Sequence, residues 1–195
     1  MRETALILVI DLEATCADDD SIPAEQMEVI EVGAVWATQE GQVLDRFQTL
    51  VRPILRPQLT QFCIQLVGIQ QAEIDLAEPF PAAASALAKF ANLHQNTRAV
   101  WMSWGQYDRK QIERECVRHG IGNPLGLEHQ NAKRLFAKAQ KIGKEIGMAK
   151  ACELAQLKLK GTHHRGLDDA CNIARLLPWA LGLRDLRQKG EGTEC

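Results

Sequence analysis

Two carboxylates, Asp11 and Glu13, directly follow the apolar run Leu6–Ile10, which is typical of a buried strand. Side chains two residues apart project from the same face of a strand, so both carboxylates can reach one cation. Burying unpaired carboxylates is costly, so such a pair is usually neutralised. Taken alone, the pair is more simply explained by an ion pair with a lysine or arginine. A metal site requires further ligands.

Two other acids provide them. Asp108 comes at the start of a predicted helix, where by itself it could simply favour the helix dipole, and Asp169 follows His164 by five residues. Hydrolysis of a phosphodiester needs a nucleophile at neutral pH and a clamp on the leaving oxygen, which two divalent ions about 4 Å apart provide. Carboxylates suit Mg²⁺ or Mn²⁺, whereas imidazole and thiolate favour zinc, so His164 serves better as a base than as a ligand.

The sequence contains a second histidine–aspartate pair with the same spacing, because His164 follows another histidine and Asp169 follows another aspartate. His163 stands five residues before Asp168. We favour His164 with Asp169 and interpret Asp168 as a solvated neighbour.

The elements that must position these groups follow from apolar periodicity. Strands are predicted at 6–10, 29–36, 47–51 and 99–104, with a hairpin turn at 40–42. Helical segments are predicted at 59–69 with Thr60 as cap, 82–93 opened by Pro81, 108–119 stopped by Gly120, 132–141, 148–157, and 167–177 broken by Pro178. This order indicates an α/β domain with a mixed sheet. A Rossmann fold is disfavoured because no G-x-G-x-x-G follows the first strand.

Length and composition fit one domain. The 195 residues are 46% hydrophobic and 25% charged, and we expect a single domain over 1–187 with a disordered tail at 188–195. The net charge of −2 does not by itself indicate a nucleic-acid partner. However, nine basic residues against two acidic ones lie between 133 and 165, which makes this stretch a candidate phosphate-contacting face. Taken alone, solvated lysines on helices are the simpler explanation for most of them, and only a few need contact a ligand.

The six cysteines show no C-x-x-C spacing and indicate reduced thiols. The first apolar run lacks a secretory cleavage site, and no stretch approaches the length of a membrane span. We therefore expect a cytoplasmic protein with no membrane partner.

These motifs together resemble the DEDD 3′-to-5′ exonuclease superfamily in its histidine variant (DEDDh). Within it, the chain is most similar to the Eri-1-like RNA exonucleases, the histone-mRNA 3′-exonuclease group. The similarity is carried by the stretches 9–16, 59–63 with Gly68-Ile69, 103–108 and 166–174. It implies an RNase H-like fold with a central mixed five-stranded sheet flanked by helices.

The resemblance also implies an activity, a metal-dependent 3′-to-5′ exoribonuclease that removes nucleoside 5′-monophosphates from RNA 3′ ends with two Mg²⁺ or Mn²⁺ ions. Asp11, Glu13 and Asp169 would hold the first ion and Asp11 would bridge to the second. Asp108 would act through metal-bound water, and His164 would be the general base.

Contacts with the 3′ terminus are implied as well. Phe62 and Tyr107 would sandwich the terminal base, although Phe62 could equally be a core aromatic, and relatives often carry Trp in place of Tyr107. The backbone around Ala14 and Thr15 would meet the ribose, where a 2′-OH could favour RNA. Arg165 would contact a backbone phosphate.

Two other functions stay open. One is a DNA-directed 3′-to-5′ exonuclease of the proofreading or repair type, with single-stranded DNA as substrate. The other is a catalytically inactive RNA-binding regulatory module. By family analogy we expect a monomer.

Overall fold

Five strands form one mixed sheet in the computed structural model, which describes residues 6–94, 96 and 98–186. In the order β3-β2-β1-β4-β5, the first three strands pair antiparallel and the last three parallel. Their bounds are Ile7–Ala14 (β1), Val29–Ala37 (β2), Val43–Leu50 (β3), Val100–Ser103 (β4) and Glu128–Asn131 (β5). The expected mixed five-stranded sheet is confirmed.

Seven α-helices and one short 3₁₀ helix surround the sheet within the described residues. They are η1 (Ala24–Gln26), α1 (Gln61–Val67), α2 (Gln71–Asp75), α3 (Phe80–Ala91), α4 (Tyr107–His119), α5 (Ala132–Ala139), α6 (Met148–Leu154) and α7 (Gly166–Ala180). As predicted, the Thr60 hydroxyl caps α1 by accepting from the Cys63 amide, and Gly120 ends α4 in the left-handed region.

Pro178 does not break the last helix, and that expectation was wrong. Helix α7 continues through it to Ala180. A proline removes its own N–H bond and crowds the carbonyl four residues earlier, but here it lies in the final turn, where little helix remains to be disrupted. Its carbonyl accepts from the amides of Leu183 (2.8 Å) and Arg184 (3.0 Å), and its ring is buried. Packing therefore outweighs the lost bond.

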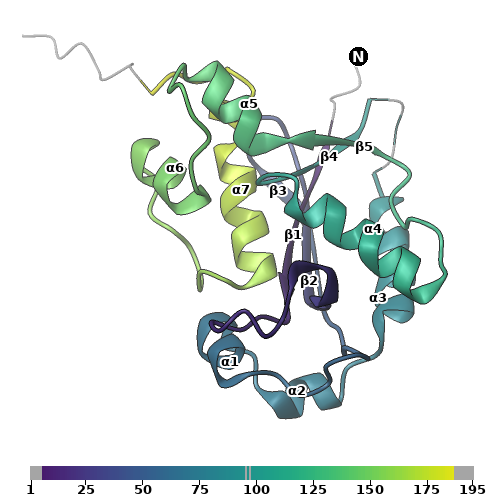
Figure 1. Ribbon diagram of the computed structural model, residues 1–195. Coiled ribbons are helices and arrows are strands. Elements are labelled where there is room, and N and C mark those ends of the chain that lie inside the picture. Colours follow the sequence, from purple (N-terminus) through teal and green to yellow (C-terminus); the bar gives the residue numbers. More distant parts are fainter. Residues whose placement is uncertain (1–5, 95, 97, 187–195) are drawn as a thin grey trace, which may run out of the picture.

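Helices α3 and α4 lie on one side of the sheet and α5, α6 and α7 on the other (Figure 1), and each side has its own apolar cluster. Leu8 and Ile10 pack in the cluster that includes α3 and α4, whereas Ile7 and Val9 pack in the cluster that includes α5, α6 and α7. Because side chains alternate along a strand, the odd-numbered positions that follow Val9 also face α7. This alternation directs the carboxylates at the end of β1 toward the start of α7.

Helix α7 approaches the sheet closely at one point, where two glycines meet. A Cβ atom on Gly33 of β2 would lie 2.0 Å from the carbonyl carbon of Gly166 and 2.1 Å from the Leu167 nitrogen. A Cβ on Gly166 would lie 3.0 Å from the Asp11 carbonyl oxygen. Only residues without a side chain allow this contact, which brings the first turn of α7 against β1 and β2.

Three further expectations concern the C-terminal residues, the cysteines and membrane spans. The predicted disordered tail at 188–195 lies outside the described residues. Within the described part of the chain, the five cysteines are free thiols, and no helix has the length and apolarity needed to cross a bilayer.

The glycine contact generates a prediction for stability. The substitution Gly33→Ala should lower the free energy of unfolding by about 3 kcal/mol, because its methyl group meets immobile backbone. Urea denaturation measures the change. Gly122→Ala is the matched control, since a Cβ there has no atom within 4 Å. Equal stability of the two variants would show that α7 does not approach the sheet this closely.

Candidate active site

A hollow of about 230 Å³ opens at the carboxyl end of β1. It is lined by side chains from β1, α4, α6, α7 and the segments that precede α4 and α7: Asp11, Leu12, Glu13, Trp104, Tyr107, Asp108, Met148, His163, His164 and Asp169. The five residues predicted to be catalytic are spread from position 11 to position 169, yet they line one hollow.

Three of the carboxylates form a cluster. Ligand atoms of Asp11, Glu13 and Asp169 all lie within 4.8 Å of one another. Asp169 is buried, and its Oδ1 atom has no hydrogen-bond partner among the described residues, whereas Oδ2 accepts from the His164 amide at 3.0 Å. A buried carboxylate oxygen without a partner is costly, which indicates that a ligand completes it.

The fourth carboxylate comes from the opposite side of the hollow. Asp108 lies in the first turn of α4, and its Oδ1 accepts a hydrogen bond of 3.1 Å from the amide of Leu12. The partial positive charge of a helix N-terminus favours a carboxylate at this position. The bond also fixes α4 to β1 between the two carboxylates of the strand.

Burial and mutual repulsion raise the pKa values of these acids. Desolvation, followed by the charges of Asp169 and Glu31, raises the pKa of Glu13 to about 8. Burial raises the pKa of Asp108 to about 6. Burial and then the charge of Asp108 raise the pKa of Asp11 well above its usual range. Without a cation, the protein leaves this repulsion largely uncompensated.

The donor set fits a hard divalent cation. The clustered atoms are carboxylate oxygens, the ligands that Mg²⁺ and Mn²⁺ prefer. A bound cation would give the Asp169 Oδ1 atom a partner. It would also lower the raised pKa values of Glu13 and Asp11, because positive charge stabilises their ionised forms. Asp11, Glu13 and Asp169 are therefore the residues that would hold such an ion.

Both histidines of the doublet line the hollow. The His163 Nδ1 atom lies 2.8 Å from Asp169 Oδ2, and the two imidazole rings stack with centroids 4.0 Å apart. Asp168 instead accepts from the Thr162 amide at 2.7 Å and does not line the hollow. The geometry therefore gives no support to a site built on His163 and Asp168.

His164 has an unusual backbone conformation, with φ of 65°. For a residue with a side chain, this left-handed region costs about 1 to 2 kcal/mol, and such strain is concentrated at functional sites. Burial, and then the neighbouring His163, lower the pKa of the His164 imidazole. The ring is therefore neutral near pH 7 and able to accept a proton.

A buried ion pair holds the segment that carries these histidines. Glu31 of β2 is fully buried and accepts from Arg165 Nε (3.2 Å), Arg165 Nη2 (3.1 Å) and the Gly166 amide (2.9 Å). The structure thus places the guanidinium of Arg165 on Glu31, and its contact with a phosphate stays a prediction. Sequence reasoning missed Glu31, although a single acid inside the apolar strand 29–36 was a usable signal.

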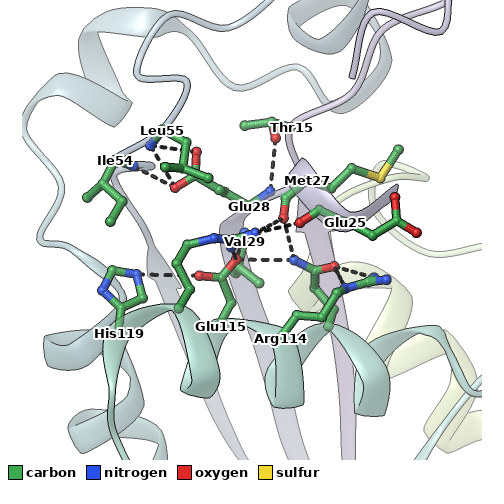
Figure 2. Close-up of polar contacts among 12 residues, drawn as sticks. Thr15, Glu25, Met27, Glu28, Val29, Ile54, Leu55, Arg114, Glu115 and His119 are labelled. Atoms are coloured by element: carbon green, nitrogen blue, oxygen red, sulfur yellow. Dashed lines mark hydrogen bonds and ion pairs between the residues drawn. The ribbon is translucent and has the colours of Figure 1, made fainter. Parts of the chain in front are cut away.

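A second polar network, around Glu115 and Glu28, supports α4, the helix that carries Asp108 (Figure 2). The buried Glu115 of α4 accepts from the Val29 amide at 3.0 Å and pairs with Arg118. Glu28 accepts from the backbone amides of Ile54 and Leu55, 2.7 Å and 2.9 Å away. The Glu115 bond fixes α4 against the start of β2, and the Glu28 bonds fix the residue before β2 to the segment that follows β3.

Of the residues predicted to contact substrate, only Tyr107 lines the hollow. Tyr107 lines the hollow with 41% of its surface exposed, so its ring is available to a base. Phe62 is partly buried in α1 and does not line the hollow. Ala14 and Thr15 are buried, and the hydroxyl and the amide of Thr15 both bond Glu28. The contacts of these residues with RNA stay predictions.

Three further lining residues, Leu12, Trp104 and Met148, were not expected. The Trp104 indole packs near Phe136 and donates to the Ile146 carbonyl oxygen at 2.9 Å, and Met148 begins α6. The contact of Trp104 with a distant loop had no sequence signal.

The fold and the site define a DEDDh exonuclease domain, a class of enzymes that hydrolyse phosphodiester bonds from the 3′ end. The family model described as RNase_T, exonuclease, matches residues 8–177. The chain belongs to this family. It resembles the crystal structure of the nuclease domain of 3′hExo, a DEDDh family member bound to rAMP, with a TM-score of 0.77 and 26% identity over 94% of this chain and 96% of that one.

Curated relatives are longer proteins. The chain is 30% identical to human ERI1 exoribonuclease 2 over 92% of its own length and 28% of the relative's. It is also 30% identical to mouse 3′-5′ exoribonuclease 1, over 87% of its own length and 51% of the relative's. The chain thus spans about a quarter to a half of these proteins.

The buried pair predicts a large effect on stability. Glu31→Gln should lower the free energy of unfolding by about 3 kcal/mol, because it leaves Arg165 without its counter-charge. Urea denaturation tests this. Glu113→Gln is the control: it removes an exposed pair with Arg109 and should change stability by less than about 1 kcal/mol. Similar losses in both variants would contradict a clamp at Glu31.

The raised pKa values predict how stability depends on pH. Folded Glu13 keeps its proton up to about pH 8, whereas an unfolded Glu releases it near pH 4.5. The folded state therefore binds more protons in this window, and metal-free stability should fall as pH rises through it. Thermal melting in EDTA measures this loss. Mn²⁺ should restore stability, most strongly at pH 8.

Glu13→Gln should flatten the pH dependence in EDTA. A metal-free melting temperature that rises between pH 5 and 8, with no gain from Mn²⁺, would contradict the repulsive cluster.

Proposed function

We propose that the protein is a metal-dependent 3′-to-5′ exoribonuclease that releases nucleoside 5′-monophosphates from RNA 3′ ends. The observation that carries this proposal is the convergence of four carboxylates and His164 on one hollow. RNA is favoured over DNA because the longer relatives are named exoribonucleases, and a similar solved structure concerns recognition of a histone mRNA stem-loop by a 3′-exonuclease. That structure is 25% identical, with a TM-score of 0.77 over 90% of this chain and 81% of that one.

Asp11, Glu13 and Asp169 would hold a divalent cation, and Asp108 faces them from α4. When bound, two such ions would make a water nucleophilic at neutral pH and stabilise the charge on the leaving oxygen. His164 takes the proton of the attacking water on a ring nitrogen, for which its lowered pKa keeps it neutral. His163 holds Asp169 in place through its Nδ1 contact.

Tyr107 supplies a surface for the terminal base. Its ring is exposed at the rim of the hollow, and its hydroxyl contacts the Met27 sulfur at 3.7 Å, which restrains the ring. Stacking on an aromatic side chain is worth about 1 to 3 kcal/mol per base and accepts any base. Trimming without strong sequence preference follows from this mode of contact.

The mechanism predicts the behaviour of two variants. Asp11→Asn and His164→Ala should each lower nucleotide release from a 5′-labelled single-stranded RNA with a 3′-hydroxyl by at least about 100-fold in Mg²⁺ or Mn²⁺. Gel analysis of the shortened products measures the rate. Asp168→Asn is the matched control and should retain most activity, because Asp168 lies outside the hollow.

Different outcomes select the alternatives. A clear rate preference for DNA of the same sequence would identify a DNA-directed exonuclease. RNA binding with no nucleotide release in either metal would identify an inactive regulatory module. If His163→Ala abolished activity while His164→Ala retained it, the base would be His163.

A further inference from the structure

The structure separates the basic residues between 133 and 165 into paired and unpaired groups. Arg165 is bound to Glu31, and Lys150 pairs with Glu153 at 2.8 Å. By contrast, the other seven form no ion pair in the described part of the chain: Lys133, Arg134, Lys138, Lys141, Lys144, Lys158 and Lys160. These seven are thus available to an external anion.

Three of these unpaired cations, Arg134, Lys138 and Lys144, line a surface groove. Two hollows, of about 380 and 290 Å³, share Arg134 and Lys138 as common lining residues. We define the basic groove by its polar lining: Gln106, Gln130, Asn131, Arg134, Lys138 and Lys144. One acid, Glu145, lies at its far end. The groove therefore carries net positive charge and several amide groups.

The groove adjoins the active-site hollow. Strands β4 and β5 run parallel, with Ser103 paired to Asn131, so their carboxyl ends meet at the edge where β1 also ends. Gln106, in the groove, directly precedes Tyr107, in the hollow. Strands are spaced by about 4.8 Å, which puts β5 about 10 Å from β1. A few nucleotides span that distance.

Trp104 provides a second connection between the hollow and the basic groove. Its indole lines the hollow and bonds Ile146, which follows the groove residues Lys144 and Glu145 in the chain. In Figure 1, β5 leads directly into α5, the helix that carries Arg134 and Lys138.

We propose that the basic groove binds the phosphodiester backbone of the RNA upstream of the 3′ end held in the hollow. This proposal rests on the proposed function. Guanidinium and ammonium groups bind phosphate oxygens, and amides bond to phosphate and sugar. The imidazole of His129, the aromatic ring of the groove, is packed against Trp101, with centroids 4.3 Å apart. The groove therefore recognises charge and backbone, not base identity.

The test is the salt dependence of RNA binding. Fluorescence anisotropy is measured with a single-stranded 20-nucleotide RNA in the Asp11→Asn background, which prevents hydrolysis. The pair Arg134→Gln and Lys138→Gln should weaken binding at least about tenfold at low salt. It should also reduce the slope of log K against log salt by about 1.4, because each phosphate contact contributes about 0.7 on a single strand.

The matched control is the pair Lys89→Gln and Arg98→Gln, which removes the same charge on and after α3 and outside the groove. It should leave the slope unchanged. An unchanged slope in the groove variant, or equal losses in both variants, would overturn the proposal and favour an anionic protein as the partner of this surface. Thermal melting confirms that each variant is folded.

A second measurement separates this proposal from the proposed function. If wild-type protein binds the 20-mer through the groove but releases no nucleotides, the proposed function fails and the groove stands. The relevant quantity is kcat/KM on a 20-mer divided by kcat/KM on a trinucleotide. If the wild-type protein trims RNA and the groove variant has the same ratio as wild type, the groove proposal fails. We expect that ratio to fall at least about tenfold.

Discussion

The contact between Gly33 and Gly166 is the constraint on which the site depends. Asp11 and Glu13 are fixed by β1, whereas Asp169 belongs to α7, near the other end of the sequence. Asp169 reaches the two β1 carboxylates because α7 begins directly against the sheet, with no side chain between Gly33 and Gly166. The Glu31–Arg165 pair holds the same point from the side by binding the amide of Gly166 as well as the guanidinium. Close packing and a buried charge pair thus act together where the chain turns into α7.

This arrangement concentrates four carboxylates in one hollow. A fold selected for stability alone would pair these carboxylates with a lysine or arginine. None of the described lysines and arginines forms an ion pair with Asp11, Glu13, Asp108 or Asp169, and burial raises the pKa values of the first three. The left-handed conformation of His164 adds strain at the same place. Both costs are understandable if an external cation and a phosphodiester complete the site.

Much of this could be predicted from the sequence because the signals are local. The apolar run before Asp11, the cap at Thr60 and the stop at Gly120 specify their elements without knowledge of the rest of the chain. Strand β5 was not located, because Glu128–Asn131 is polar and becomes a strand only by pairing with β4. Glu31 stands out inside an apolar strand, but its partners Arg165 and Gly166 come from a segment far along the chain, which no local pattern identifies. The contact of His163 with Asp169 spans only six residues, but it depends on the turn that precedes α7.

The central claim is that the carboxylates of β1 and α7 form one cation site. Anomalous scattering from crystals grown with Mn²⁺ and a nucleoside 5′-monophosphate tests it most directly. A strong peak is expected within coordination distance of Asp11, Glu13 and Asp169, together with a base against Tyr107. A manganese peak held elsewhere, or an Asp11 and Glu13 pair neutralised by a protein side chain with no bound ion, would contradict it.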